Sequence, residues 1–419
     1  KDLRIGDRIV CIRNLTINNK IRNDNIKQRI LELLSKKNFY AKLKVDFSNF
    51  LNKKIKEYGI RNIKTSIKHR SFYEGARKNR YNIGDLLNIS NLFEIEYKEL
   101  YDKIDSIFYR TGKQRGQNSL SMKLPQNFED FFYLAGLFIG DGSGKKFVAG
   151  KKQLAKKVEE ICESLDIKTK YVLREDRTPE VHTILTLIEI FNCLFDYPLK
   201  KKSHNIKISK FVWESDNKLI ANLLKGYFDT DGCVERSRRA ITISSASKKI
   251  IEDLHLLLLR FGCISIKEKD NTISISGISA INFEKNIGFN LIEKVEKLRN
   301  LVSKVSGSIV CDTIKIGNQV MLVNKKIKDY SNNELAYIEV TKMEETFEEV
   351  VYDFTIPENH NFIAEGMVIH NTAFTDVLLA AAGMMATKYA GSLDEGMMTW
   401  QHADEQERLM TVDAANVSM

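Results

Sequence analysis

Two nine-residue segments of similar sequence, 90 positions apart, constrain the fold of this chain more than any other feature. The first is Leu134–Gly142 (LAGLFIGDG) and the second is Leu224–Gly232 (LKGYFDTDG). Strand-like alternation and then a helical stretch follow each copy, over Phe147–Val172 and Ala240–Ile266. The repeat therefore predicts two similar halves that each combine helices with strands.

Each copy has the pattern of a helix that ends at a C-cap glycine, with Asp141 or Asp231 in its last turn. The helix dipole disfavours an anion there by ~0.3–1 kcal/mol, and two adjacent carboxylates repel further. The small residues Ala135, Gly136 and Gly226 would let the two helices pack closely. We expect the two ends to meet and a divalent cation to offset the repulsion.

Oxygen ligands of this kind suit Mg²⁺, and paired metals suit phosphodiester hydrolysis. For a single copy, an ordinary Asp-Gly turn after a buried helix is the better interpretation, because such short motifs are frequent false positives. Two copies in a strongly basic chain favour the metal site instead.

Residues 125–300 resemble the LAGLIDADG (dodecapeptide) homing endonucleases, including Lys202-Ser203 and Phe211 before the second copy and Ile287-Gly288-Phe289 after it. The resemblance implies two αββαββα-like halves in pseudo-twofold arrangement. It also implies a saddle of two sheets that binds a long asymmetric site in double-stranded DNA, and Mg²⁺-dependent cleavage of both strands.

The metal-binding acids of that family map onto Asp141 and Asp231. Family members also use lysines near the site, for which Lys202 and Lys294 are the candidates. Lysines are abundant in this chain, so a solvated-surface role for both stays open.

The charge distribution separates the chain into two parts. The whole chain has a formal charge of +10, but its last 48 residues carry seven acidic side chains against Lys388 and Arg408. Residues 1–371 are therefore strongly basic, which favours a polyanionic partner such as DNA. Phosphate contacts would make binding salt-dependent.

Composition excludes several other classes of protein. The six cysteines are scattered without a Cys-x-x-Cys pair, so neither a zinc ribbon nor disulfides are indicated. The sequence contains no apolar run near the ~20 residues that a membrane span needs. We expect a cytoplasmic monomer without a membrane partner.

Residues 21–123 are predicted to be a helical basic region. Helical periodicity covers Ile26–Leu34, Phe47–Ile60 and Ile83–Ile107. The stretch Phe47–Arg80 is loosely similar to a helix-turn-helix that would add DNA contacts. A solvated helical spacer is an equally good interpretation.

A composition break at Asn371–Thr372 marks a junction, because Ile is absent after it and six of the ten Met residues follow it. The segments Val351–Ala364 and Val368–Asn371 lie directly before the break and resemble the C-terminal splicing blocks of inteins. A buried structural histidine and a simple turn are the alternatives.

The intein resemblance implies a specific chemistry at the junction. Asn371 would cyclise to a succinimide and break the bond to Thr372, while His370 and His360 act as acid/base partners. The Thr372 hydroxyl would accept the upstream segment by transesterification, with Asp353 activating or orienting that attack.

The first residues show a departure from the intein pattern. Leu3–Val10 turns at Gly-Asp into an alternating strand, but no opening Cys or Ser nucleophile and no Thr-x-x-His block precede it. Cys11 is expected to be a buried strand cysteine rather than the nucleophile. We expect a fragment that can cleave after Asn371 but cannot complete splicing.

Beyond the junction, Thr372–Met385 and Asp404–Ser418 resemble the GTPase domain of translation elongation factor two. The resemblance makes Thr372 the Mg²⁺-binding threonine of the phosphate loop and Thr411 the switch threonine. GTP and the ribosome would concern only the spliced host protein, since Gly and Lys do not precede Thr372.

Together these patterns predict an α+β multidomain chain: an endonuclease inserted into an all-β Hint splicing domain, with the helical basic region beside it. The predicted segments are 1–20 and 305–371 (splicing), 21–123 (basic), 124–304 (endonuclease) and 372–419 (host fragment). The alternatives are a splicing element with an inactive endonuclease, and a translation GTPase fragment with a basic insertion.

Overall fold

A computed structural model of the 419-residue chain divides into two compact units, residues 16–331 and residues 1–15 with 332–419. The described residues are 4–6, 8–12, 15, 25–59, 63, 67, 72–111, 119–174, 177–200, 202–268, 270–306, 309–316, 319–326, 335–340, 343, 351–352, 361–364, 366–370 and 416–417. The boundary at Ser331 lies later than residue 304, where the sequence analysis ends the endonuclease.

The larger unit contains two halves with the same order of elements: helix, two strands, helix, two strands, helix. The first half is α7 (Phe128–Asp141), β5 (Gly142–Ser143), β6 (Lys146–Val148), α8 (Lys152–Ser164), β7 (Lys170–Arg174), β8 (Arg177–His182) and α9 (Leu185–Phe195). The second is α12 (Asn217–Asp231), β9 (Gly232–Glu235), β10 (Ala240–Ser244), α13 (Lys248–Leu259), β11 (Ile266–Glu268), β12 (Thr272–Ser276) and α14 (Gly277–Asn286). The short helices α10 (Lys202–Asn205) and α11 (Lys210–Trp213) connect the halves.

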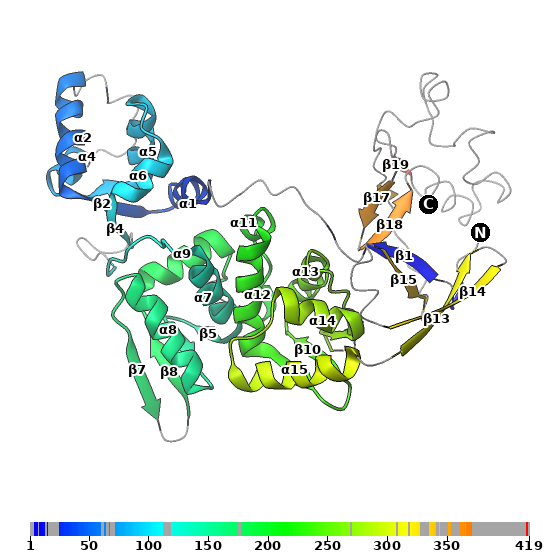
Figure 1. The fold of residues 1–419 in the computed structure, drawn as a ribbon. Coiled ribbons are helices and arrows are strands. Elements are labelled where there is room, and N and C mark those ends of the chain that lie inside the picture. Colours follow the sequence, from blue (N-terminus) through cyan, green and yellow to red (C-terminus); the bar gives the residue numbers. More distant parts are fainter. Residues whose placement is uncertain are drawn as a thin grey trace, which may run out of the picture. The chain divides into compact units, whose positions relative to one another are not determined.

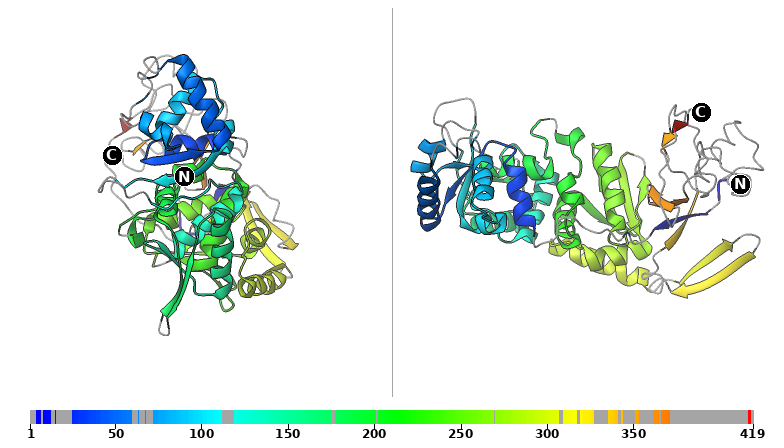
Figure 2. Two further views of the ribbon diagram at one scale, coloured as in Figure 1. Left: turned by 90° about the vertical axis from the view of Figure 1, so that its left-hand side faces the viewer. Right: turned by 90° about the horizontal axis from the view of Figure 1, so that it is seen from above.

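Each half has one four-stranded antiparallel sheet with the same spatial order of strands. That order is β5-β6-β8-β7 in the first half and β9-β10-β12-β11 in the second. In both sheets, the strand that follows the motif helix lies at one edge. The β7–β8 hairpin extends well beyond the helices of its half (Figure 2).

The motif helices α7 and α12 lie side by side in the middle of this region (Figure 1). The Asn127 side chain caps α7 by accepting a hydrogen bond from the Asp130 N–H. Phe131 to Ile139 are all buried, so α7 is apolar around its whole circumference. A helix of that kind belongs in a protein core, where neighbouring elements cover every face.

One face of the second sheet is buried and the other is polar. Ile241 and Ile243 on β10, with Ile273 and Ile275 on β12, are almost completely buried. Thr242 and its neighbours point to the opposite face, because successive strand residues alternate. The second face is therefore polar, and its central residues Thr242 and Ser274 are themselves 5% and 7% exposed.

Residues 25–111 form an α+β subdomain, whereas the sequence analysis predicted helices alone. Its elements are α1 (Ile26–Leu34), β2 (Phe39–Leu43), α2 (Val45–Tyr58), α4 (Phe72–Arg77), β3 (Tyr81–Asn82), α5 (Ile83–Leu92), α6 (Tyr97–Lys103) and β4 (Ile104–Tyr109). The strands pair in the antiparallel order β3-β2-β4. The expected helical stretch Ile83–Ile107 is broken after α5, where Glu94 adopts a left-handed backbone conformation with φ of 55°.

The helix-turn-helix resemblance of this subdomain is not decided by the structure, because most residues between α2 and α4 lie outside the described ones. Contacts with the first half and with the segment that connects the two halves are well defined. Arg29 on α1 forms an ion pair with Glu214 at 3.3 Å, and the Cys193 thiol donates to the Leu33 carbonyl at 3.2 Å. The subdomain therefore packs on the helical side of the repeat region.

After α14, the chain forms α15 (Ile292–Ser306) and a hairpin of β13 (Ile309–Ile316) and β14 (Gln319–Lys326). The hairpin completes the larger unit. Across the described part of the chain, no helix is both long and apolar enough to cross a bilayer.

The smaller unit joins the two ends of the chain in one antiparallel sheet. Its strand order is β15 (Leu335–Glu339), β1 (Arg8–Ile12), β18 (Met367–His370) and β17 (Asn361–Ala364). A further pair joins β16 (Val351–Tyr352) to β19 (Asn416–Val417). The prediction for Cys11 is confirmed, since it is a buried strand residue and burial raises the pKa of its thiol.

Candidate active site at the ends of two paired helices

Two glycines allow the backbones of α7 and α12 to approach closely. A Cβ atom added at Gly136 would collide with the carbonyl oxygen of Leu223, and one added at Gly226 would collide with that of Tyr133. Leu223 and Tyr133 occupy the same position of the two copies, as do the two glycines. The contact between the helices is therefore reciprocal.

This close packing brings the carboxyl ends of the two helices together. The last residues of α7 and α12 are Asp141 and Asp231. One residue before Asp141, Gly140 lies against the Thr230 side chain, and a Cβ atom there would lie 3.2 Å from the Asp231 Oδ1 atom. Asp141 is half-buried and Asp231 is exposed, so a solvent-side ligand can reach this end of the helix pair.

Glycine follows each acid at the C-cap, but for a different reason from the one that the sequence suggested. Gly142 and Gly232 have φ of −76° and −77°, which any residue can adopt, so neither has the left-handed conformation of a usual glycine cap. A Cβ at Gly142 would collide with the Phe138 carbonyl oxygen. The glycines therefore provide space for the chain to leave the helix directly as a strand.

Lys294, in the first turn of α15, covers the end of α12. Its ammonium group donates hydrogen bonds to the carbonyl oxygens of Phe228 at 2.9 Å, Asp229 at 2.7 Å and Thr230 at 3.4 Å. The Phe228 carbonyl also accepts from the C-cap N–H of Gly232, and a cation is favourable at that end of the helix dipole.

The charge of Lys294 also acts on the acids of the site. Burial lowers the pKa of the Lys294 ammonium, and the carboxylates of Asp229, Asp231 and Asp141 oppose that shift. The structure thus gathers Asp141, Asp231 and Lys294 in one place. Lys294, one of the two lysine candidates from the sequence, therefore places positive charge beside the two acids.

Asp229 is a buried carboxylate that the sequence analysis did not select. It is 1% exposed and accepts hydrogen bonds from the Tyr133 hydroxyl at 2.8 Å and from the Asn290 N–H at 3.1 Å. Burial raises its pKa, while these hydrogen bonds act in the opposite direction. The sequence contained a signal, because the first copy has Ile139 at the equivalent position.

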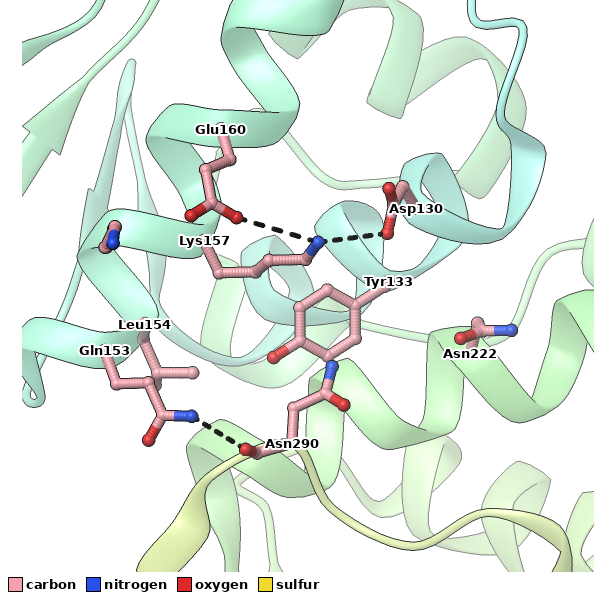
Figure 3. Close-up of a pocket in the computed structure, with 9 residues that line it drawn as sticks. Asp130, Tyr133, Gln153, Leu154, Lys157, Glu160, Asn222 and Asn290 are labelled. Atoms are coloured by element: carbon pink, nitrogen blue, oxygen red, sulfur yellow. Dashed lines mark hydrogen bonds and ion pairs between the residues drawn. The ribbon is translucent and has the colours of Figure 1, made fainter.

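A polar pocket of about 460 Å³ lies beside this carboxylate (Figure 3). Tyr133 and Asn290 line it from α7 and from the chain before α15. In the figure, Gln153 of α8 reaches Asn290, and its amide donates to the Asn290 carbonyl at 2.8 Å. Lys157 lies between Asp130 and Glu160, with which it pairs at 3.4 and 3.9 Å. The first half thus helps to hold the start of α15.

The other candidate residues are placed only in part. Lys202 begins α10, but its side chain lies outside the described ones. His370 is the last residue of β18 and pairs with Asn361, and its side chain is likewise not described. The remaining splicing and GTPase candidates all lie outside the described residues: Asp353, His360, Asn371, Thr372 and Thr411.

The donor atoms at the helix ends fit a hard divalent cation. Among the described residues, no group of three or more His, Cys, Asp or Glu side chains could hold a metal ion. The described part of this site therefore offers the two carboxylates of Asp141 and Asp231. Mg²⁺ is often bound in this way, through one or two carboxylates, with water and substrate phosphate oxygens as the other ligands.

Comparison with known proteins identifies the second half directly. Residues 218–288 match the model of the LAGLIDADG-like domain. The whole chain aligns with elongation factor 2 of Methanopyrus kandleri at 31% identity and covers 36% of that protein. About half of the chain aligns with a probable translation initiation factor IF-2 of Thermococcus kodakarensis, at 33% identity over 20% of that protein. The chain thus spans about a third or less of these relatives.

Solved structures of low sequence identity match part of the chain. The homing endonuclease I-DmoI in complex with DNA and Mn matches 38% of this chain and 97% of its own, at 17% identity and a TM-score of 0.31. The N-terminal LAGLIDADG domain of WhiA matches 39% of this chain and 84% of its own, at 14% identity and a TM-score of 0.30.

Proposed function

We propose that this chain, which carries a LAGLIDADG-like domain and is similar to elongation factor 2 along its whole length, is part of an intein whose inserted domain is a site-specific, metal-dependent DNA endonuclease. The observation that carries the proposal is the meeting of α7 and α12, which brings Asp141 and Asp231 to one place beside Lys294. Paired acids at adjoining helix ends suit hydrolysis of a phosphodiester in each strand.

The two halves are proposed to be related by an approximate two-fold axis between α7 and α12. Their identical element order, identical strand order and reciprocal glycine contacts support this arrangement. Such an axis matches the geometry of duplex DNA, whose two strands are themselves related by local two-fold symmetry. Each acid would then face one of the two scissile phosphates.

Asp141 and Asp231 would hold the divalent cations, for which Mg²⁺ is our proposal. When bound, the cations supply an activated water and stabilise the leaving oxygen. The two carboxylates would fix the position of the cations, and Lys294 holds the end of α12 and adds positive charge.

The polar faces of the two sheets are the proposed DNA-binding surface. On the first sheet, Glu180 accepts from Lys146 at 2.6 Å and lies 3.0 Å from His182, and these bonds lower the pKa of its carboxyl. On the second sheet, Thr242 donates to Glu235 at 2.8 Å. Polar side chains of this kind suit recognition of base edges, while lysines and arginines contact phosphates. The different residues on the two faces favour an asymmetric target.

The smaller unit is proposed to be the splicing domain, a Hint-like domain interrupted by the endonuclease. The pairing of β1 with β15 and β18, across an insertion of some 300 residues, supports this interpretation. Asn371 would break the Asn371–Thr372 bond by cyclisation, with His370 at the end of β18 as its acid partner. GTP and ribosome binding are proposed only for the spliced host protein.

The test of the endonuclease uses the full chain and a plasmid that carries the host reading frame with the codons of the inserted element removed. Mg²⁺ should produce one double-strand break near the former insertion point, and EDTA should prevent it. Asp141→Ala and Asp231→Ala should abolish cleavage while the variants still bind the same DNA. DNA binding without cleavage by the wild-type chain would favour an inactive endonuclease instead.

A further inference from the structure

Asp229 and Lys294 connect α12 and α15 in both directions. The Asp229 carboxylate accepts from the N–H groups of Asn290 and Leu291, at 3.1 and 3.2 Å, just before the first turn of α15. The Lys294 ammonium in that turn donates to the last carbonyls of α12, including that of Asp229 at 2.7 Å. The Asp229 carboxylate thus binds the amino end of α15, and the Lys294 ammonium group binds the carboxyl end of α12.

Both contacts are favourable because each charge lies at the helix end of opposite partial charge. The Tyr133 hydroxyl completes the link by donating to Asp229 Oδ2 at 2.8 Å from α7. Tyr133 and Asp229 are each 1% exposed, so water cannot replace these bonds. We call Tyr133, Asp229 and Lys294 the α12 anchor.

The first half has no equivalent acid, because Ile139 occupies the position of Asp229. A different contact holds the end of α7. The Tyr197 hydroxyl donates to the Gly142 carbonyl at 3.1 Å, and the Tyr197 ring packs on Phe138 with ring centroids 4.6 Å apart. Tyr197 is 4% exposed. The backbone beside the two acids is therefore held by chemically different groups. Tyr197 holds the residue after Asp141, whereas the α12 anchor holds the helical turn before Asp231.

We propose that the two halves of the site are positioned independently: the α12 anchor holds Asp231 for cleavage of one DNA strand, and Tyr197 holds Asp141 for cleavage of the other. This inference rests on the proposed endonuclease function. Tyr133, Asp229 and Tyr197 are positioning residues, because each acts through the backbone that carries an acid. Loss of either support should then slow one strand selectively.

The experiment measures the two strands separately. A duplex cut from the host reading frame described above carries a different fluorophore at each 5′ end, and single-turnover cleavage is followed in Mg²⁺. Asp229→Asn and Tyr133→Phe should slow the same strand, by about 10–100-fold for a lost outer-shell partner. Tyr197→Phe should slow the opposite strand, so that nicked DNA accumulates with the reverse polarity.

The matched control is Tyr101→Phe, because its buried hydroxyl donates to the Pro125 carbonyl at 2.6 Å, just before the amino end of α7 and not at the end that carries Asp141. It should leave the ratio of the two strand rates unchanged. Melting temperature and DNA binding without metal show whether each variant folds.

Equal slowing of both strands in Asp229→Asn and Tyr197→Phe would overturn independent positioning while the endonuclease function stands. Unchanged rates in folded variants would overturn it too. A wild-type chain that cuts neither strand would overturn the endonuclease and this inference together.

Discussion

Gly136 of α7 and Gly226 of α12 each lie against the backbone of the opposite helix, at matching positions of the two sequence copies. A Cβ atom at Gly136 would collide with the Leu223 carbonyl oxygen, and one at Gly226 with the Tyr133 carbonyl oxygen. In both cases the obstacle is backbone, which cannot rotate away. The distance between the helices therefore depends on the absence of a side chain at Gly136 and Gly226. The separation of Asp141 from Asp231 depends on it too.

We expect Gly136→Ala and Gly226→Ala to destabilise the chain, although alanine ordinarily stabilises a helix by about 1 kcal/mol relative to glycine. The added methyl must push the helices apart, and overpacking of this kind typically costs about 1–3 kcal/mol. Thermal or urea denaturation measures the loss of stability. The separated acids should also lower DNA cleavage more than stability alone explains.

Gly150→Ala is the matched control for the glycine variants. Thr178 Cγ2 would lie 4.0 Å from a Cβ atom at Gly150, an ordinary van der Waals distance, and the Gly150 backbone needs no left-handed conformation. Its effect on stability should stay within about 0.5 kcal/mol, as for most surface substitutions. Equal losses at Gly150 and Gly226 would contradict the close-packing explanation.

The repeat was sufficient to predict mixed α/β architecture and a LAGLIDADG-type domain, because a nine-residue pattern that occurs twice encodes the same local structure twice. The strand Phe39–Leu43 was missed for the opposite reason. It pairs with Ile104–Tyr109, more than 60 residues away. Its five residues are too few to produce a periodicity that competes with the helical patterns around them.

Only the part of the candidate site that lies in the repeated motif could be predicted from the sequence. Asp141 and Asp231 follow from the repeat, whereas the one sequence signal for Asp229, the difference from Ile139 at the equivalent position, does not show what its carboxylate contacts. Its role depends on Tyr133 and Asn290, which come from distant segments. The glycines after the acids were selected correctly, but the physical reason is space against Phe138 and Phe228 rather than a left-handed backbone.

Divalent metal should stabilise the folded chain in the absence of DNA. The Asp141 and Asp231 carboxylates are close to one another, and a cation bound between them favours the folded state. At a tenfold excess over its Kd, the metal should add about 1.4 kcal/mol to the free energy of unfolding. A thermal-shift titration with Mg²⁺ measures this, and the variant with Asp141→Asn and Asp231→Asn should show no shift. An equal shift in that variant would place the metal elsewhere.

The buried Asp229 carboxyl should make stability depend on pH. Burial raises its pKa above the unfolded value of about 3.9. Its contribution to folding is therefore fully present below that pH and is lost as pH rises through the folded value. Asp229→Asn removes this dependence. The stability of the variant relative to wild type should be higher at pH 7 than at pH 4, as measured by urea denaturation.

Glu293 provides the test of opposite sign. Hydrogen bonds from Lys297 and Lys151 lower the pKa of Glu293 to about 2. Its contribution is present above the ordinary glutamate pKa and is lost as pH falls towards 2. Glu293→Gln should therefore differ from wild type at pH 7 and become equal to it near pH 2. The same direction of change in both variants would contradict the pKa assignments.

DNA affinity should fall steeply with salt, and part of the slope should come from the subdomain at residues 25–111. Residues 25–110 contain nineteen basic and ten acidic side chains, and Lys53 and Lys56 are exposed on α2. Each phosphate contact contributes about −0.9 to the slope of log K against log salt. Replacing both lysines with alanine should make the slope shallower by about 1–2 without changing sequence preference.

Lys297→Ala, which removes a lysine paired with Glu293 at 2.6 Å, should leave the slope unchanged. If the slope of the double variant equals that of the wild-type chain, the two lysines release no counterion and contact no phosphate. That result would favour a structural role for the subdomain.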